Sequence, residues 1–310
     1  MSRRVLILAL LALAAAASAC SLPGAAAPTP FTLPTPNLTL TAIFAPTATP
    51  TEVLATETPA VAQTIAIPTF TPTSVALTPA GGPTATVDPS GTRPNGAPLN
   101  AANLAVAPAI DGELGEWTGG SYPLPACVYG CSLRSGDADL SAQVYLGWDA
   151  TNLYLAVQVR DDKLVVVRSG RNLYLSDDIE IQFDANLAAD FTSASLSSDD
   201  YQIGLSAGNF GTIAANAYRW YPRSIEGALS AVVVKGKQLT DGYTLEAKIP
   251  WTVFGVTPAA GAKYGFAVSV SDDDQAGTAV QQSMISTVAS RKLLNPTTWG
   301  TLVLAPSGGS

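Results

Sequence analysis

The stretch Ser176–Asp184, with the sequence Ser-Asp-Asp-Ile-Glu-Ile-Gln-Phe-Asp, decides the fold of this chain. Its two isoleucines and its phenylalanine alternate with Glu, Gln and Asp. Alternation with a period of two is typical of a β-strand that has one face in a core and one polar face. A polar, acidic sheet face can bind a cation or a polyhydroxylated ligand, and it can also simply be solvated.

The same alternation recurs in later segments of the chain and predicts an all-β fold. Leu140–Trp148 and Asn152–Val159 both alternate, and the turn-like residues between them predict a hairpin. Further strands are predicted at 163–168, 178–184, 200–206, 211–218, 229–235, 243–249, 264–271, 281–288 and 298–304. Residues 251–254, between a proline and a glycine, form the predicted helical turn. Many short antiparallel strands with turn residues between them predict a two-sheet sandwich.

Residues 1–19 have the pattern of a secretory signal peptide. Arg3 and Arg4 precede an apolar run that ends in small residues directly before Cys20. A Cys in this place resembles a bacterial lipoprotein lipobox, with Ala17 where the box usually has Leu. We therefore expect an exported protein whose lipidated Cys20 anchors it to the extracellular face of the cell membrane, with no other membrane contact. The alternative is an ordinary signal peptide that is cut near Cys20.

Residues 20–98 differ in composition from the remainder of the chain. Fifteen of the 23 prolines lie in this segment, interleaved with Thr and Ala. A segment without periodic apolar positions cannot bury enough surface to offset the entropy lost on ordering, so it is predicted to be a disordered linker. Residues 99–306 are long enough for one β-domain. The net charge of −8, with no basic cluster, argues against a nucleic-acid partner. We also expect the protein to be a monomer.

The cysteine and histidine content limits the chemistry. Export makes a disulfide between Cys127 and Cys131 plausible, and two free thiols are the alternative. The chain has no His, which excludes Ser-His-Asp and Cys-His catalysis and His-ligated zinc. A glycosidase needs only two carboxylates, but no pair stands out among the acids. No enzymatic activity is predicted.

Five segments carry short motifs in a fixed order: Ile110–Trp117 opens with Ile-Asp-Gly, Gly147–Val157 holds Trp-Asp and Leu-Tyr, Ser176–Asp184 holds Asp-x-Ile-Glu-Ile, Tyr243–Trp251 holds Glu-Ala-Lys-Ile-Pro-Trp, and Trp299–Leu304 closes the domain. Together they resemble the family 9 carbohydrate-binding module, within the DOMON-like group of sandwiches. The resemblance implies an immunoglobulin-like antiparallel β-sandwich of about ten strands. It also implies non-catalytic binding of a poly- or oligosaccharide between two aromatic rings, and structural calcium.

The resemblance suggests where a sugar would bind. Trp299 resembles the C-terminal aromatic of the family's clamp, although a core position is the alternative. The other clamp Trp is replaced here, and Tyr174 is the substitute closest to its place. Trp220, with Arg219 and Arg223 beside it, is a second aromatic source whose guanidinium groups can hydrogen-bond sugar hydroxyls. The remaining tryptophans of the β-domain are predicted to lie in the core: Trp117, Trp148 and Trp251.

Acidic pairs near strand ends are candidate calcium ligands. Calcium binds six to eight oxygens from carboxylates and carbonyls, which loops at a sandwich end can supply. Asp177, Asp178 and Asp272 are the strongest candidates because they border the recognised strands. The chain has no Asp-x-Asp-x-Asp-Gly loop, and the alternative is that these acids are solvated.

Two other functions stay open. One is a surface adhesion or scaffold domain without sugar binding, which the missing clamp Trp favours. The other is a haem-binding electron-transfer relative of the same fold, with Met284 and a lysine such as Lys292 as axial ligands. The chain has no Cys-x-x-Cys-His motif, and Met284 lies in an alternating segment where packing is the simpler interpretation.

Overall fold

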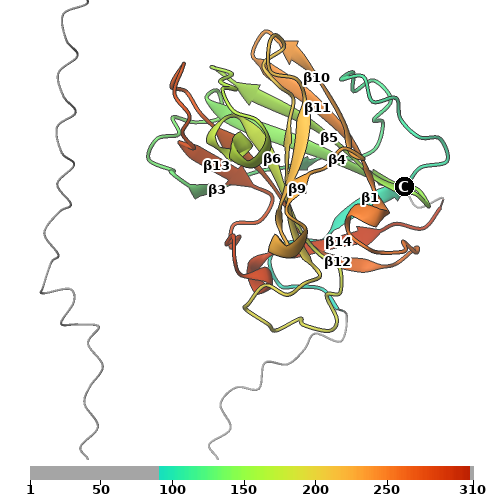
Figure 1. Ribbon diagram of the computed structural model, residues 1–310. Coiled ribbons are helices and arrows are strands. Elements are labelled where there is room, and N and C mark those ends of the chain that lie inside the picture. The colour runs from blue at the N-terminus through green and yellow to red at the C-terminus, as the bar shows by residue number, and fades with distance from the viewer. Residues whose placement is uncertain (1–90, 308–310) are drawn as a thin grey trace, which may run out of the picture. The chain divides into compact units, whose positions relative to one another are not determined.

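Fourteen β-strands and four 3₁₀ helices make up residues 91–307, the part of the chain that this computed structural model describes (Figure 1). The strands are β1 (Leu99–Asn103), β2 (Tyr122–Pro123), β3 (Ala126–Tyr129), β4 (Leu140–Trp148), β5 (Asn152–Asp161), β6 (Asp178–Asp184), β7 (Asp200–Ser206), β8 (Asn216–Tyr221), β9 (Gly227–Ala228), β10 (Val233–Leu239), β11 (Gly242–Pro250), β12 (Lys263–Asp272), β13 (Ser283–Ser286) and β14 (Gly300–Leu304). The helices are η1 (Gly170–Leu175), η2 (Arg223–Ile225), η3 (Trp251–Val253) and η4 (Pro296–Thr298). The predicted signal peptide, Cys20 and most of the predicted linker lie outside the described residues.

Strand β1 joins the two halves of the sheet. Residues 99–101 pair with β14, and residues 102–103 pair with β4, both in parallel. One half continues in the order β14-β12-β6-β7-β8-β9, and the other in the order β4-β5-β11-β10. The pairings between the other described strands are antiparallel. The all-β prediction is therefore confirmed, and the parallel pairings of β1 are an addition to it.

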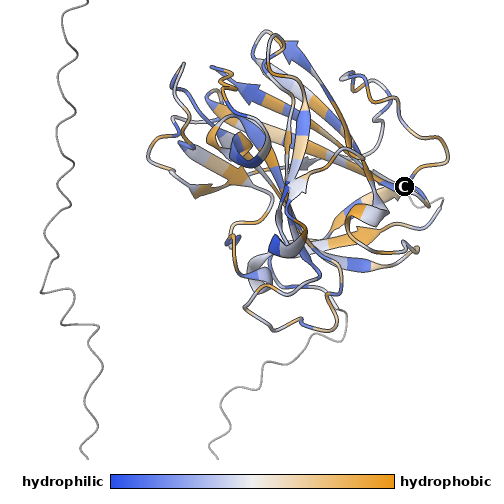
Figure 2. Cartoon of the chain, in the orientation of Figure 1, coloured by the Kyte–Doolittle hydropathy of each residue, from blue (hydrophilic) through white to orange (hydrophobic). Residues whose placement is uncertain are grey.

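The core lies between the two halves and follows from the alternation in the sequence. Figure 2 shows hydrophobic and hydrophilic residues alternating along the strands. On β6, Phe183 is fully buried, and its ring centroid lies 4.1 Å from that of Phe254 and 4.8 Å from that of Tyr264. Residues from both halves, including Ile181 and Leu155, belong to the same buried cluster. Burying one such side chain stabilises the fold by roughly 1.5–3 kcal/mol.

Three of the predicted strands are wrong in whole or in part, and the one predicted at 229–235 begins only at Val233. Residues 163–168 form no strand, because their backbone N–H groups bond to side chains: Val165 donates to Asp177 Oδ2, and Val167 donates to Ser176 Oγ. The strand predicted at 211–218 begins only at Asn216, because Asn209 Oδ1 accepts hydrogen bonds from the backbone of residues 211 and 213. Side-chain acceptors thus replace the ladder at both places.

Residues before the predicted start of the domain belong to its folded part. Residues 91–98, predicted to belong to the linker, pack on the domain: Arg93 is 1% exposed and its Nη2 lies 2.7 Å from Asp184 Oδ2. The domain therefore begins earlier than residue 99.

Cys127 and Cys131 form the expected disulfide. Within residues 91–307, no helix has the length and apolar character needed to cross a membrane.

Candidate functional site

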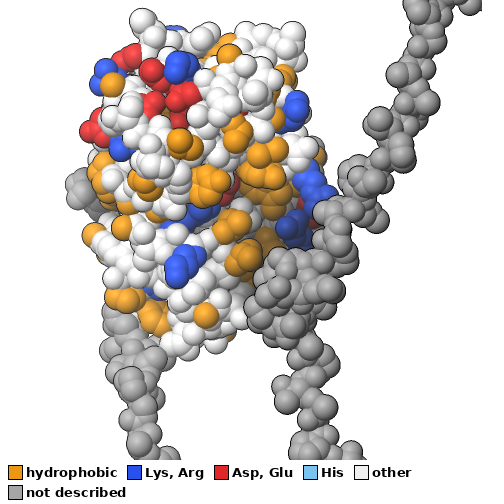
Figure 3. Space-filling view, turned by 90° about the vertical axis from the view of Figure 1, so that its left-hand side faces the viewer, with side chains coloured by type: hydrophobic (Ala, Val, Ile, Leu, Met, Phe, Trp, Pro, Cys, Tyr) orange, Lys and Arg blue, Asp and Glu red, His pale blue; other side chains and the backbone are white. Residues whose placement is uncertain are grey.

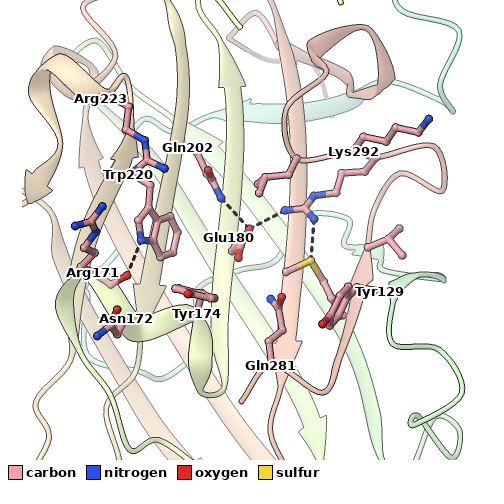
Figure 4. Close-up of a pocket in the computed structure, with 14 residues that line it drawn as sticks. Tyr129, Arg171, Asn172, Tyr174, Glu180, Gln202, Trp220, Arg223, Gln281 and Lys292 are labelled. Carbon is pink, nitrogen blue, oxygen red and sulfur yellow. Dashed lines mark hydrogen bonds and ion pairs between the residues drawn. The ribbon is translucent and has the colours of Figure 1, made fainter. Parts of the chain in front are cut away.

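A cavity of about 640 Å³ lies over the polar face of β6 (Figure 4). Side chains reach it from η1, from strands β3, β6, β7, β8 and β13, from η2, and from the loops around β13. Its lining residues are Val128, Tyr129, Arg171, Asn172, Tyr174, Glu180, Gln202, Trp220, Arg223, Gln281, Met284, Arg291, Lys292 and Leu293. A volume of this size suits a ligand of one to a few rings.

Glu180 lies in the centre of the cavity wall in Figure 4 and is only 4% exposed. Its Oε2 atom accepts hydrogen bonds from Arg291 Nη2 at 2.6 Å and from the amides of Gln182 and Gln202 at 3.3 Å. Among the described residues, no hydrogen bond goes to Glu180 Oε1. The polar face of β6 is therefore covered rather than solvated, and it keeps one acceptor for a ligand.

Two aromatic rings form the wall beside this acceptor. Tyr174 is 37% exposed, and its ring meets the ring of Trp220 edge to face with centroids 6.0 Å apart. Trp220 is 6% exposed, and its Nε1 donates to the carbonyl of Arg171 at 2.7 Å. Gly204 leaves room for this packing, since a Cβ there would lie 2.3 Å from the Trp220 ring. Of these two rings, Tyr174 is thus the exposed one, and Trp220 supports it.

Trp299 does not contact the cavity, which corrects its expected place in an aromatic clamp. It is 1% exposed and packs against Ala267 and Val288. Its Nε1 donates to the carbonyl of Lys292 at 2.9 Å, so it holds the loop that brings Arg291 and Lys292 to the cavity. Its role is therefore to position that loop.

The two arginines predicted near Trp220 lie in different places. Arg223 lines the cavity, as expected. Arg219 does not, because its guanidinium donates to the carbonyls of Ile225 at 2.9 Å and of Val253 at 3.3 Å. Sequence reasoning did not identify Glu180, Gln202, Arg171 or Arg291 as site residues. Glu180 stands on the polar face of the opening stretch, whereas a lone arginine such as Arg291 carries no signal in the sequence.

The remaining wall comes from the disulfide loop and from β13. The Cys127–Cys131 disulfide closes the loop that places Val128 and Tyr129 at the cavity. Met284 is 1% exposed, and its Sδ lies 3.0 Å from Arg291 Nη1. The packing interpretation of Met284 therefore fits its surroundings better than axial ligation does.

A second feature is a buried acidic cluster formed by Asp161, Asp177 and Asp272. One carboxylate oxygen from each lies within 4.8 Å of the others. Asp161 ends β5, Asp177 precedes β6, and Asp272 ends β12, so the cluster joins the two halves of the sheet at one edge. Asp177 and Asp272 are among the predicted calcium ligands, and Asp161 is an addition to them. Asp161 joins the cluster because the end of β5, in one half of the sheet, lies next to the ends of β6 and β12 in the other half.

The cluster contains buried oxygens without hydrogen-bond partners among the described residues. These are Asp161 Oδ2, Asp272 Oδ1 and the hydroxyl of Tyr243. Burial, together with neighbouring carboxylates, raises the pKa of Asp161 to about 6 and that of Asp272 to about 7. Burial, and then the charge of Asp161, raises the pKa of Asp177 well above its usual value. A divalent cation bound by oxygen ligands would relieve both the repulsion and the missing contacts.

Asp178 is not part of this cluster, although both of its carboxylate oxygens are buried without a hydrogen-bond partner among the described residues, and its expected role as a ligand stays a prediction. It lies on β6, two residues from Glu180, and burial followed by the charge of Glu180 raises its pKa well above the usual value. Two further groups of acids occur in residues 91–307: Asp139, Asp162 and Asp274, and Asp184, Asp190 and Asp200. In the second of these groups, the guanidinium of Arg93 already pairs with Asp184.

Among the predicted core tryptophans, Trp148 and Trp251 are buried. Trp117 is only half-buried, because it lines a separate hollow of about 720 Å³ in which its ring meets Tyr145 at 6.2 Å. Its Nε1 donates to Glu246 Oε1 at 2.7 Å. This bond fixes the segment that opens with Ile-Asp-Gly.

The site can be compared with known proteins. A sequence model described as "Carbohydrate family 9 binding domain-like" matches residues 110–307. A solved carbohydrate binding module family 9 from Caldicellulosiruptor kristjanssonii, in complex with cellotriose, is 25% identical, with a TM-score of 0.52 over 69% of this chain and 95% of that chain. The module in complex with glucose is 25% identical, with a TM-score of 0.51 over 69% and 99%. No curated protein matches the chain.

The buried acids predict how stability depends on pH without calcium. Asp272 titrates near 3.8 when unfolded and at about 7 when folded, so its contribution is full below about pH 4 and is lost as pH rises to about 7. The contribution of Asp161, whose pKa is raised to about 6 in the folded state, is also lost as pH rises. We expect the urea midpoint in calcium-free buffer to fall over this range. The double variant Asp161→Asn, Asp272→Asn should flatten the profile, and a midpoint that rises with pH would contradict the assignment.

Proposed function

Because the chain belongs to the carbohydrate family 9 binding domain-like family, we propose that it binds carbohydrate in the cavity over β6, without catalysing a reaction. The observation that carries the proposal is the placing of the exposed Tyr174 ring beside the free Oε1 of Glu180. The apolar face of a pyranose stacks on an aromatic ring, and its hydroxyls need positioned acceptors and donors. The solved family 9 modules in complex with cellotriose and glucose support the same function.

The cavity offers two exposed rings, those of Tyr174 and Tyr129, which are 37% and 52% exposed. Trp220 meets Tyr174 edge to face and is 6% exposed, so a sugar would stack on Tyr174 or Tyr129 rather than on Trp220. The side-chain amides of Asn172, Gln202 and Gln281 line the same cavity and can donate to ring hydroxyls or accept from them. These polar groups would therefore contribute to specificity, because stacking on a ring is common to all pyranoses.

Replacing the exposed ring tests the proposal. Tyr174→Ala should weaken binding of a soluble oligosaccharide by up to about tenfold, since a stacked ring contributes about 0.5–1.5 kcal/mol. Phe210→Ala is the matched control, because Phe210 is 36% exposed and does not line the cavity. Isothermal titration measures both variants. Equal affinity of wild type and the double variant Tyr129→Ala, Tyr174→Ala would place the sugar elsewhere, because Tyr129 is the other exposed ring of the cavity. An absence of binding to every oligosaccharide would refute the function.

We also propose that the cluster of Asp161, Asp177 and Asp272 binds structural calcium. The buried oxygens without partners support this, because calcium prefers carboxylate and other oxygen ligands. Bound there, the ion would link β5 to the strands β6 and β12 of the other half. Its contribution would be to stability, since none of these three residues lines the cavity over β6.

Calcium should raise the melting temperature. At calcium concentrations about 100 times Kd, binding to the folded state adds about 2.7 kcal/mol, which is about 5–10 °C for a domain of roughly 200 residues. Asp272→Asn should abolish this increase. Asp241→Asn should keep it, because Asp241 is 69% exposed and pairs only with Arg160 at the surface. Identical melting curves for the wild type in chelator and in calcium would exclude the site.

We further propose that the protein is exported and lipid-anchored at Cys20, with the Pro- and Thr-rich segment as a spacer. The signal pattern and the Cys after small residues support this. Detergent phase partitioning of cells that express the full chain tests it: wild type should enter the detergent phase, and Cys20→Ala should enter the aqueous phase. Wild-type protein in the aqueous phase would contradict the anchor.

A further inference from the structure

The cavity over β6 has a charge opposite to that of the chain. Four of the 16 Lys and Arg residues line it, namely Arg171, Arg223, Arg291 and Lys292, against one of the 24 Asp and Glu residues, Glu180. The chain as a whole carries a net charge of −8. On the face shown in Figure 3, acidic side chains gather at the upper left, and basic side chains lie beside hydrophobic ones around the hollow in the middle.

Two of these cations are held at the mouth of the cavity by one carboxylate. Glu226 Oε1 lies 3.0 Å from Arg171 Nε, and Glu226 Oε2 lies 2.9 Å from Arg223 Nη1. The hydrogen bond from Arg223, aided by one from Tyr218, lowers the pKa of Glu226. One ionised carboxylate therefore balances only one of two guanidinium groups. Both remain more than 60% exposed and keep N–H donors for a ligand.

The other two cations differ from each other. Arg291 is neutralised by Glu180 at 2.6 Å. The Nζ of Lys292 makes no hydrogen bond or ion pair with the described residues, and this exposed side chain also lines the cavity. Four cations and two carboxylates leave a surplus of two positive charges around the proposed sugar site. A neutral glycan does not require this surplus.

We infer that the cavity selects acidic oligosaccharides, whose rings carry carboxylate or sulfate groups. This inference rests on the proposed carbohydrate binding and names its ligand class. The sugar ring would stack on Tyr174, and its anionic group would meet the free N–H groups of Arg171 and Arg223 or the ammonium of Lys292. A guanidinium fork matches the geometry of a carboxylate or sulfate and forms charge-assisted hydrogen bonds.

Titration calorimetry with three oligosaccharides of similar length tests the inference: a galacturonic acid trimer, a sulfated carrageenan oligomer and cellotriose. We expect at least one acidic ligand to bind about tenfold tighter than cellotriose, as one or two charge-assisted bonds provide. Its affinity should fall by at least about threefold between about 50 mM and about 500 mM NaCl, while that of cellotriose stays constant. The two acidic ligands separate carboxylate from sulfate recognition.

Variants identify the groups responsible. Arg171→Gln, Arg223→Gln should weaken the acidic ligand by about tenfold and cellotriose by less than about threefold. Lys292→Gln is a second variant. The ammonium group of Lys292 makes no hydrogen bond or ion pair with residues 91–307, so the substitution breaks no such contact. Lys235→Gln, at an exposed position on β10 outside the cavity, is the control and should change neither affinity.

The outcomes separate the two proposals. Cellotriose binding as tight as acidic binding would overturn the inference and leave the carbohydrate function intact. Acidic binding that survives the cavity variants would overturn it as well, because attraction elsewhere on the surface would then explain the preference. An absence of binding to all three ligands and to other oligosaccharides would remove both proposals.

Discussion

A buried ion pair between Glu180 and Arg291 holds the cavity together. The two side chains are 5% and 8% exposed, and Arg291 also donates to the amide oxygen of Gln182 at 3.1 Å. The pair ties the loop after β13 to the polar face of β6. Removing one partner of a buried pair leaves an uncompensated charge, which costs about 3–5 kcal/mol, so the pair fixes this loop. Lys292 reaches the cavity because Arg291 is held.

The sequence could predict most of the fold because alternation and turn residues are local signals. The hairpin of β4 and β5 and the strand β6 have the predicted boundaries or nearly so. Two of the failures occur where a side-chain acceptor takes the place of a strand partner: Asp177 and Ser176 do so for residues 163–168, and Asn209 does so for the start of 211–218. An alternating apolar pattern states which residues are buried, and it does not state which group accepts the backbone hydrogen bonds.

The site was harder to predict than the fold because it depends on burial and on distant pairing. Trp299 and Tyr174 are both aromatic residues near recognised strands, yet one is 1% and the other 37% exposed. The two rings differ in exposure because Trp299 is covered by the loop after β13, whereas Tyr174 lies on η1 at the cavity. Asp161 meets Asp177 and Asp272 because the edges of the two sheet halves converge, which spacing along the chain does not reveal. Arg171 lines the cavity because it lies on η1, which forms part of the cavity wall.

The segments that carry the family resemblance mainly hold the scaffold. Asp149 accepts a hydrogen bond from Tyr154 at 2.7 Å and closes the hairpin of β4 and β5. Glu246 accepts bonds from the backbone of Gly112 and from the Trp117 indole, each at 2.7 Å, and so joins the first motif to the fourth. The groups that line the cavity come largely from η1, η2 and the loops around β13, outside these motifs. Family membership therefore defines the scaffold, and the proposed ligand class rests on the charge and the exposed rings that these other segments contribute.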